Sequence, residues 1–137
     1  MSLLDRVRDL LRSTKEPELT PDTPGLAVVA EAFDIAEADS AVLARSHLWQ
    51  QGKAAVLRHH LSLPSDRVGE AGRLLAQDGW ELRTVSEWDG VSRVQAMRVQ
   101  ELDALHCAQE RSRMAGLAQR LGGDSLGWDA LQQVDPG

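Results

Sequence analysis

The feature of this 137-residue sequence that most constrains its fold is the pair Asp89-Gly90, which stands between two segments of alternating apolar and polar residues. Asp-Gly in that setting is a strong signal for a two-residue β-hairpin turn, because the favoured turn needs positive φ at both central positions. The register that this turn sets predicts three apolar cross-strand pairs: Trp88 with Val91, Leu82 with Met97, and Trp80 with Val99. We therefore expect these pairs to form the buried face of the hairpin.

The opposite face of the same hairpin is expected to be largely open to solvent. Antiparallel sheets commonly bury one face and expose the other. The side chains that the predicted register places on the open face are Arg83, Val85, Val94, Ala96 and Arg98.

A further strand is predicted upstream, over Ala54 to Pro64, where apolar residues alternate with polar ones. His59 falls among leucines on the face expected to be buried, whereas His60 falls on the open face. The strand is followed by a helix that Ser65 is expected to cap and that Gly79 is expected to end.

The carboxyl-terminal part of the chain predicts a long helix and a short last strand. Asp103 can cap the helix Ala104 to Leu121, whose stripe of small residues suits close packing on a sheet. Gly122 or Gly123 is expected to end that helix with a positive φ, and Gly127 to let the backbone turn into the strand. Trp128 is then expected on the buried face.

The order of elements from residue 53 to residue 135 is strand, helix, strand, strand, helix, strand. This order predicts an α+β fold of the ferredoxin-like split β-α-β type, with a four-stranded antiparallel sheet and two helices on one face. Two segments are expected to precede this domain. Residues 1–25 predict an amphipathic helix and a Pro-rich linker, and residues 26–52 predict a helical segment, although the stretch GLAVVAEAF within it also fits a strand.

Composition limits the classes of function. The formal net charge of -6 argues against a protein that mainly binds nucleic-acid phosphates. Cys107 is the single cysteine, so neither an internal disulfide nor a cysteine zinc cage can form. The sequence shows neither a signal peptide nor a run long enough to span a membrane, and we expect a cytoplasmic protein.

The residues that could carry catalysis do not form a recognisable site. His59 and His60 are neighbours on a strand and point to opposite faces, so they cannot bind one metal ion together. His59 is better interpreted as a hydrogen-bonded core histidine, and Cys107 as an inert thiol on a sheet-facing stripe. We therefore expect neither an enzyme nor a cofactor or metal site, although a metal-dependent hydrolase that uses the histidines is a third hypothesis.

The open face of the predicted sheet is the candidate binding surface. It lacks the aromatic side chains on which RNA-recognition motifs stack unpaired bases, so we expect no direct contact with nucleic acid. A basic and polar patch on an acidic protein suits a protein partner instead. The residues predicted to bind that partner are Arg58, His60, Arg83 and Arg98.

Three short stretches, in this order, resemble the regulator of ribonuclease E activity B (RraB) family. They are RHHLS at 58–62, DGWEL at 78–82 and LGGDSLGW at 121–128. The residues that match family motifs, to which we assign structural roles, are His59, Gly79, Trp80, Gly122, Gly123, Gly127 and Trp128. His60 completes the histidine pair of the family motif.

The resemblance implies a ferredoxin-like fold and a non-enzymatic cytoplasmic protein that binds ribonuclease E, or an assembly for RNA degradation, and lowers its activity. This chain departs from the family where Arg58 replaces an acidic residue and where Ser125 and Leu126 replace Tyr-Asp. The alternative function is a small-molecule sensor of the ligand-binding ferredoxin-like type.

Overall fold

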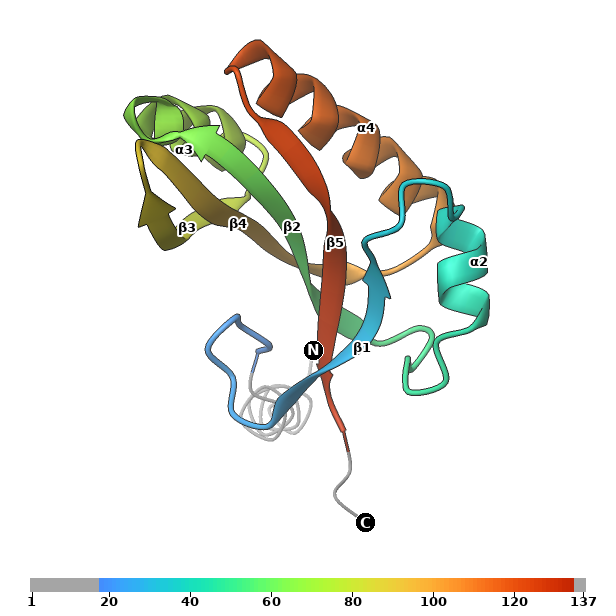
Figure 1. The fold of residues 1–137 in the computed structure, drawn as a ribbon. Coiled ribbons are helices and arrows are strands. Elements are labelled where there is room, and N and C mark those ends of the chain that lie inside the picture. The colour runs from blue at the N-terminus through green and yellow to red at the C-terminus, as the bar shows by residue number, and fades with distance from the viewer. Residues whose placement is uncertain (1–17, 135–137) are drawn as a thin grey trace, which may run out of the picture.

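The computed structural model describes residues 18–134, and in this part the alternating segments form one five-stranded antiparallel sheet (Figure 1). The strand order is β1-β5-β2-β4-β3. The fold is therefore α+β, as predicted, but the expected number of four strands is wrong. The strands are β1 (Leu26–Ala32), β2 (Ala54–Pro64), β3 (Glu81–Trp88), β4 (Val91–Glu101) and β5 (Asp124–Gln133).

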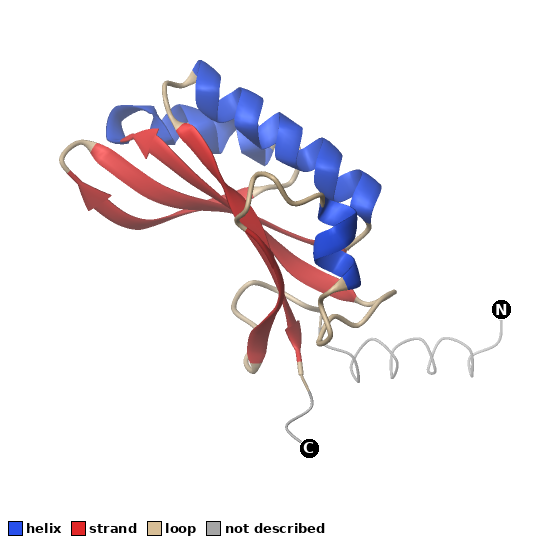
Figure 2. Ribbon diagram, turned by 45° about the vertical axis from the view of Figure 1, so that its right-hand side comes forward, coloured by secondary structure: helices blue, strands red, loops and turns tan. Residues whose placement is uncertain are grey.

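The helices of residues 18–134 lie on one face of the curved sheet, and in this part of the chain the other face carries no helix (Figure 2). Helix α4 packs on β5 and β2, while α3 packs on β3. Here we call the helix-covered side the core face and the other side the open face. The helices are α2 (Asp39–Ala44), α3 (Val68–Ala76, after a short 3-10 turn at Ser65–Arg67) and α4 (Ala104–Arg120).

The core forms between the sheet and these helices. Leu57, Leu61 and Leu63 of β2 are fully buried, as the alternation predicted. Small residues let the helices approach closely: Ala71 of α3 is fully buried, and the side chain of Leu82 lies directly against Gly72. The buried residues of α4 are Cys107, Met114, Leu117 and Ala118.

The prediction of a helical segment over 26–52 is wrong for its first part, where Leu26–Ala32 is strand β1. This strand pairs with β5 and so enlarges the sheet by one edge strand. Because of a register shift between Val28 and Ala30, two consecutive residues, Val29 and Ala30, are both buried. Such a bulge interrupts the two-residue period, which made the segment resemble a helix. Only residues 39–44 of the segment form an α-helix.

The Asp89-Gly90 turn is confirmed, because both residues have positive φ and Trp88 pairs with Val91. The register beyond the turn is wrong by one residue, since a bulge between Thr84 and Ser86 brings Leu82 opposite Ala96. The bulge breaks the alternation along β3, so that Leu82 lies on the core face whereas Trp88 lies on the open face. Consequently Val94 and Ala96 are buried, whereas Trp88, expected in the core, is 84% exposed.

The predicted ends of the helices are confirmed at their glycines and at Asp103. The Asp103 carboxylate accepts a hydrogen bond from the His106 backbone N–H at 2.8 Å. Gly79 and Gly122 adopt φ of 81° and 84°, which ordinary residues resist. The expected cap at Ser65 is wrong, because its side chain makes no capping bond and its hydroxyl lies 2.8 Å from that of Ser92.

The closing stretch of the chain depends on two close backbone approaches. A Cβ at Gly123 would lie 2.0 Å from the Ser62 carbonyl oxygen, and one at Gly127 would lie 2.3 Å from that of Ala32. Only glycine fits at these positions. Trp128 follows directly and is fully buried, as predicted.

The predicted amino-terminal helix lies outside the described residues, and of the Pro-rich linker the structure describes residues 18–25 as a loop. Within the described range, none of the helices is both long enough and apolar enough to cross a membrane.

Candidate partner-binding surface

The open face is organised around one buried carboxylate, Asp129 of β5. Arg58 of β2 lies directly opposite and donates two hydrogen bonds to it, at 2.7 Å from Nε to Oδ1 and 2.5 Å from Nη2 to Oδ2. The Nε2 atom of His60 lies 3.1 Å from Oδ1, although its N–H is not aimed at the oxygen. Burial alone would raise the pKa of Asp129, but hydrogen bonding and the positive charge of Arg58 outweigh it and lower the pKa. Arg58 is thus neutralised and is not a free cation.

The predicted binding residue Arg83 is also on the open face, but it holds a segment of its own chain. Its guanidinium donates to both carboxylate oxygens of Asp22, at 2.8 and 2.9 Å, and to Glu81 at 3.2 Å. These hydrogen bonds lower the pKa of Asp22. Residues 18–21 of the same loop line one hollow with Met97 and Val99 of β4. The loop therefore covers the part of the open face next to these two residues.

The placement of Arg98 on the open face is wrong, because the one-residue register shift moves it to the core face. There its guanidinium stacks over the Trp80 ring at 4.1 Å. It also donates to the Asp78 carbonyl oxygen at 3.0 Å and to Glu110 of α4 at 2.6 Å. Desolvation raises the pKa of Glu110 in spite of this pairing. Arg98 therefore joins the hairpin to α4.

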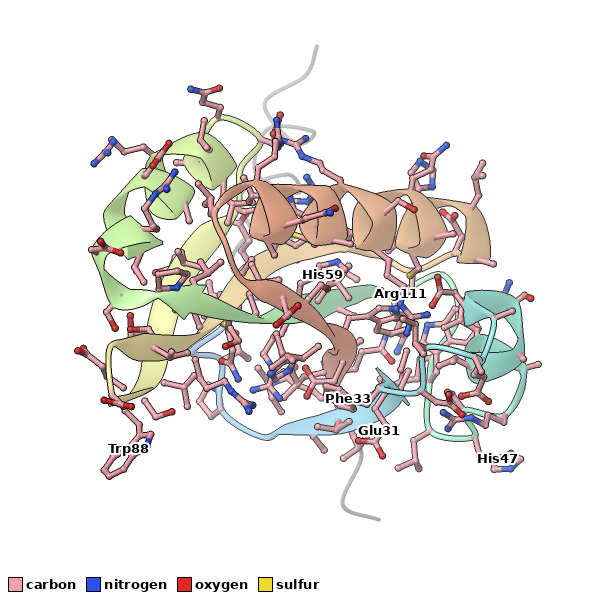
Figure 3. The ribbon with its side chains drawn as sticks, turned by 45° about the horizontal axis from the view of Figure 1, so that its top comes forward. Glu31, Phe33, His47, His59, Trp88 and Arg111 are labelled. Atoms are coloured by element: carbon pink, nitrogen blue, oxygen red, sulfur yellow. The ribbon has the colours of Figure 1, made fainter. Side chains whose placement is uncertain are left out.

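His59 is fully buried on the core face, as predicted, but the prediction that it is hydrogen-bonded is wrong. Neither ring nitrogen has a hydrogen-bond partner among residues 18–134. The ring packs edge to face on Trp80 with centroids 5.2 Å apart, and it lies beneath α4 in Figure 3. Burial, with a smaller contribution from the neighbouring His60, lowers the pKa of His59 to about 3, so the side chain is neutral at physiological pH.

Cys107 is buried on α4 and lies apart from solvent. Burial raises the pKa of the Cys107 thiol to about 12, which leaves it protonated and unreactive. Within residues 18–134 no three side chains of the metal-binding types His, Cys, Asp and Glu come together.

Sequence reasoning missed the most exposed part of the open face, the far end of the β3–β4 hairpin. Val85, Trp88 and Val91 are 60%, 84% and 45% exposed, and we call these three residues the hairpin patch. Figure 3 shows Trp88 projecting outward from the end of the hairpin. The predicted register had assigned Trp88 and Val91 to the core, and no local signal marked the bulge that exposes them.

Phe33 was missed as well, because it lies in the segment expected to be helical. It follows β1 and its ring meets the His60 ring at a centroid distance of 5.2 Å and an angle of 66°. Gly127 makes room for the Phe33 ring, because a Cβ there would lie 2.8 Å from the Phe33 Cδ1 atom. The open face therefore carries an aromatic side chain that the strand pattern alone did not place there.

Comparisons with models of protein families, with curated proteins and with solved structures found no match to this chain. The resemblance to the RraB family thus remains a prediction from three short motifs.

Proposed function

We propose that this protein is a non-enzymatic regulator that binds a protein partner with the open face of its sheet. The observation that carries the proposal is the hairpin patch, Val85, Trp88 and Val91, which leaves three large apolar side chains in contact with solvent at one end of that face. Exposed apolar groups with a polar rim are typical of interaction sites. Tryptophan is moreover among the residues that contribute most to binding energy at protein interfaces.

We further propose that the partner is ribonuclease E or an assembly for RNA degradation, and that binding occurs in the cytoplasm and lowers RNA cleavage. This choice rests on the three RraB-like motifs. Beside them, strands β2 to β5 with α3 and α4 follow the order of a ferredoxin-like domain, to which β1 adds an edge strand. Three of the motif residues, Gly123, Gly127 and Trp128, have structural roles in this arrangement.

The proposal is tested by measuring binding of the full chain to purified ribonuclease E from the same organism by surface plasmon resonance, together with the rate of RNA cleavage. We expect saturable binding and a cleavage rate that falls as binding rises. The double variant Val85→Ser/Trp88→Ser should weaken binding about tenfold or more, because it removes the apolar patch.

Leu105→Ser is the matched control, since Leu105 is 65% exposed but lies on α4. It should leave the affinity unchanged. Absence of binding by the unmodified chain would rule out ribonuclease E, and equal losses in both variants would rule out the hairpin patch as the contact surface.

A small-molecule sensor is the second candidate function, and one hollow on the open face favours it. The hollow has a volume of about 210 Å³ and brings His60, Arg93 and Gln95 together with the apolar side chains of Val85 and Leu126. A ligand that binds there would raise the melting temperature of the folded chain. A thermal-shift screen of small carboxylic acids against the full chain discriminates the two functions.

A further inference from the structure

Three hollows on and beside the open face are connected through shared side chains. The first, of about 430 Å³, is lined by Trp88 and Val91. It shares Ser86 and Arg93 with the hollow beside His60, which is about 210 Å³. That hollow shares Leu126 with a third, of about 230 Å³, which Phe33 and Ile35 line with residues of α4. The three hollows follow one another from the tip of the β3–β4 hairpin to the edge of β5 beside α4, and we call this row of hollows the hairpin groove.

The dimensions of the hairpin groove suit an extended peptide. It crosses from β3 over β4 and β2 to β5. At the usual strand spacing this is about 14 Å, which roughly five extended residues span. The hollows are open and lie in a row rather than in one closed cavity, so a chain segment fits them better than a compact ligand.

Both ends of the groove carry exposed apolar side chains. Trp88 and Val91 stand at the hairpin end. Phe33 and Ile35, the latter 94% exposed, stand at the β5 end beside Leu126. Each end can therefore bury one apolar side chain of a bound segment, which is the usual source of affinity in such grooves.

The centre of the groove carries a positive charge that the described chain leaves unpaired. Arg93 of β4 is exposed and makes no ion pair or side-chain hydrogen bond with residues 18–134, whereas Arg58 and Arg83 both pair with carboxylates. The neighbours of Arg93 on the adjacent strands are Ser62 and Ser86, whose hydroxyls add neutral hydrogen-bonding groups. A carboxylate at this point meets complementary charge.

Charge also limits what the hairpin end accepts. Trp88 stands between Glu87 and Asp89 in the sequence, so an acidic side chain would be repelled there. The favourable position for an acidic residue is the centre of the groove and not its hairpin end.

We propose that the hairpin groove binds an extended segment of a protein partner in which one acidic residue, held by Arg93, stands between two apolar residues. The proposal rests on the protein-binding function set out above and specifies the chemistry of the partner. The first apolar residue packs on Trp88 and Val91, and the second packs on Leu126 and Phe33. The distance from Val91 to Arg93 along β4 corresponds to about two residues of the bound segment, and the distance from β4 over β2 to β5 corresponds to about three. In the bound segment the acidic residue is therefore about two residues from the first apolar residue and about three from the second.

The test is a selection from a displayed library of random 12-residue peptides on the immobilised full chain, followed by fluorescence anisotropy with the most enriched peptide. We expect enriched sequences to share an acidic residue between two apolar ones. Arg93→Glu and Trp88→Ala should each weaken the labelled peptide about tenfold. Arg73→Glu makes the same charge change on an exposed residue of α3 and should leave the affinity unchanged.

A charge exchange makes the test specific for Arg93. Replacing the acidic residue of the peptide by lysine should abolish binding to the unmodified chain and restore it to Arg93→Glu. Enrichment of peptides without an acidic residue, no enrichment above the blank surface, or equal binding by Arg93→Glu and Arg73→Glu would overturn the proposal. Failure of ribonuclease E to bind, with peptide selection as expected, would remove only that partner.

Discussion

The rings of His59 and Trp80 meet edge to face in the core, with their centroids 5.2 Å apart, and neither nitrogen of His59 has a hydrogen-bond partner among residues 18–134. The histidine therefore contributes packing but cannot accept a proton without placing a charge in an apolar region. Its folded-state pKa of about 3 lies below the value near 6.5 of a histidine in an unfolded chain.

This difference predicts that acid destabilises the fold through His59. Below pH 6.5 the unfolded chain binds a proton that the folded chain refuses until pH falls to about 3, so the contribution of neutral His59 to stability is complete above pH 6.5 and declines below it. The loss is about 1.4 kcal/mol per pH unit within that window. Urea unfolding at pH 7.5, 6.5 and 5.5 measures it.

His59→Leu isolates the effect, because leucine cannot titrate. We expect the variant to be at least as stable as the unmodified chain at pH 7.5, since it removes two unsatisfied buried nitrogens. Its stability should depend less steeply on pH below 6.5. Equal pH slopes for the two proteins would show that folding does not lower the pKa of His59.

The pairing of Asp129 with Arg58 predicts a large loss of stability for Asp129→Asn. The substitution leaves Arg58 partly buried without its partner, and we expect a cost of about 2 to 4 kcal/mol in the free energy of unfolding. Glu81→Gln removes a more exposed ion pair, that with Arg83, and should change stability little. Urea titrations of both variants at pH 7 compare them, and similar small losses would contradict a structural role for Asp129.

How much could be predicted from the sequence is clearest at the β3–β4 hairpin. Turn chemistry is local, so Asp89-Gly90 correctly placed the turn, but the bulge between Thr84 and Ser86 puts Leu82 and Trp88, expected on one face, on opposite faces. That single extra residue exposed Trp88, moved Arg98 to the core face and buried Ala96. Bulges depend on contacts with other strands and helices, and the composition of 81–88 carries no mark of one.

The same limit applies to β1 and to the charges of the candidate surface. β1 is an edge strand with its own bulge, and only its pairing with β5 distinguishes it from a helix. Arg58 and Arg83 were correctly placed on the open face. Their partners, Asp129 and Asp22, lie 71 and 61 residues away in sequence, so the neutralisation of both cations could not be predicted from local patterns.

Two glycines predict opposite effects of the same substitution. Gly123→Ala would place a Cβ 2.0 Å from the Ser62 carbonyl oxygen, and because that atom belongs to the backbone of β2, we expect a loss of about 3 kcal/mol or more. Gly116 lies within α4 with open space around it, so Gly116→Ala should stabilise the chain by about 0.5 to 1 kcal/mol. Thermal unfolding of both variants checks the contrast. A neutral Gly123→Ala would mean that β2 and β5 do not approach as closely as described.

Asp39 joins three elements and gives the last prediction. Its buried carboxylate accepts a hydrogen bond from the Trp128 indole N–H at 3.0 Å and one from Arg111 of α4 at 2.9 Å. Asp39→Ala would leave both donors without this acceptor and remove the link between α2, α4 and β5. We expect a loss of about 2 to 4 kcal/mol in the free energy of unfolding. Trp128→Phe removes only the indole donor but also part of the core volume, so a double-mutant cycle separates the hydrogen bond from packing. A coupling energy near zero between the two sites would show that the Trp128 indole is held by packing alone.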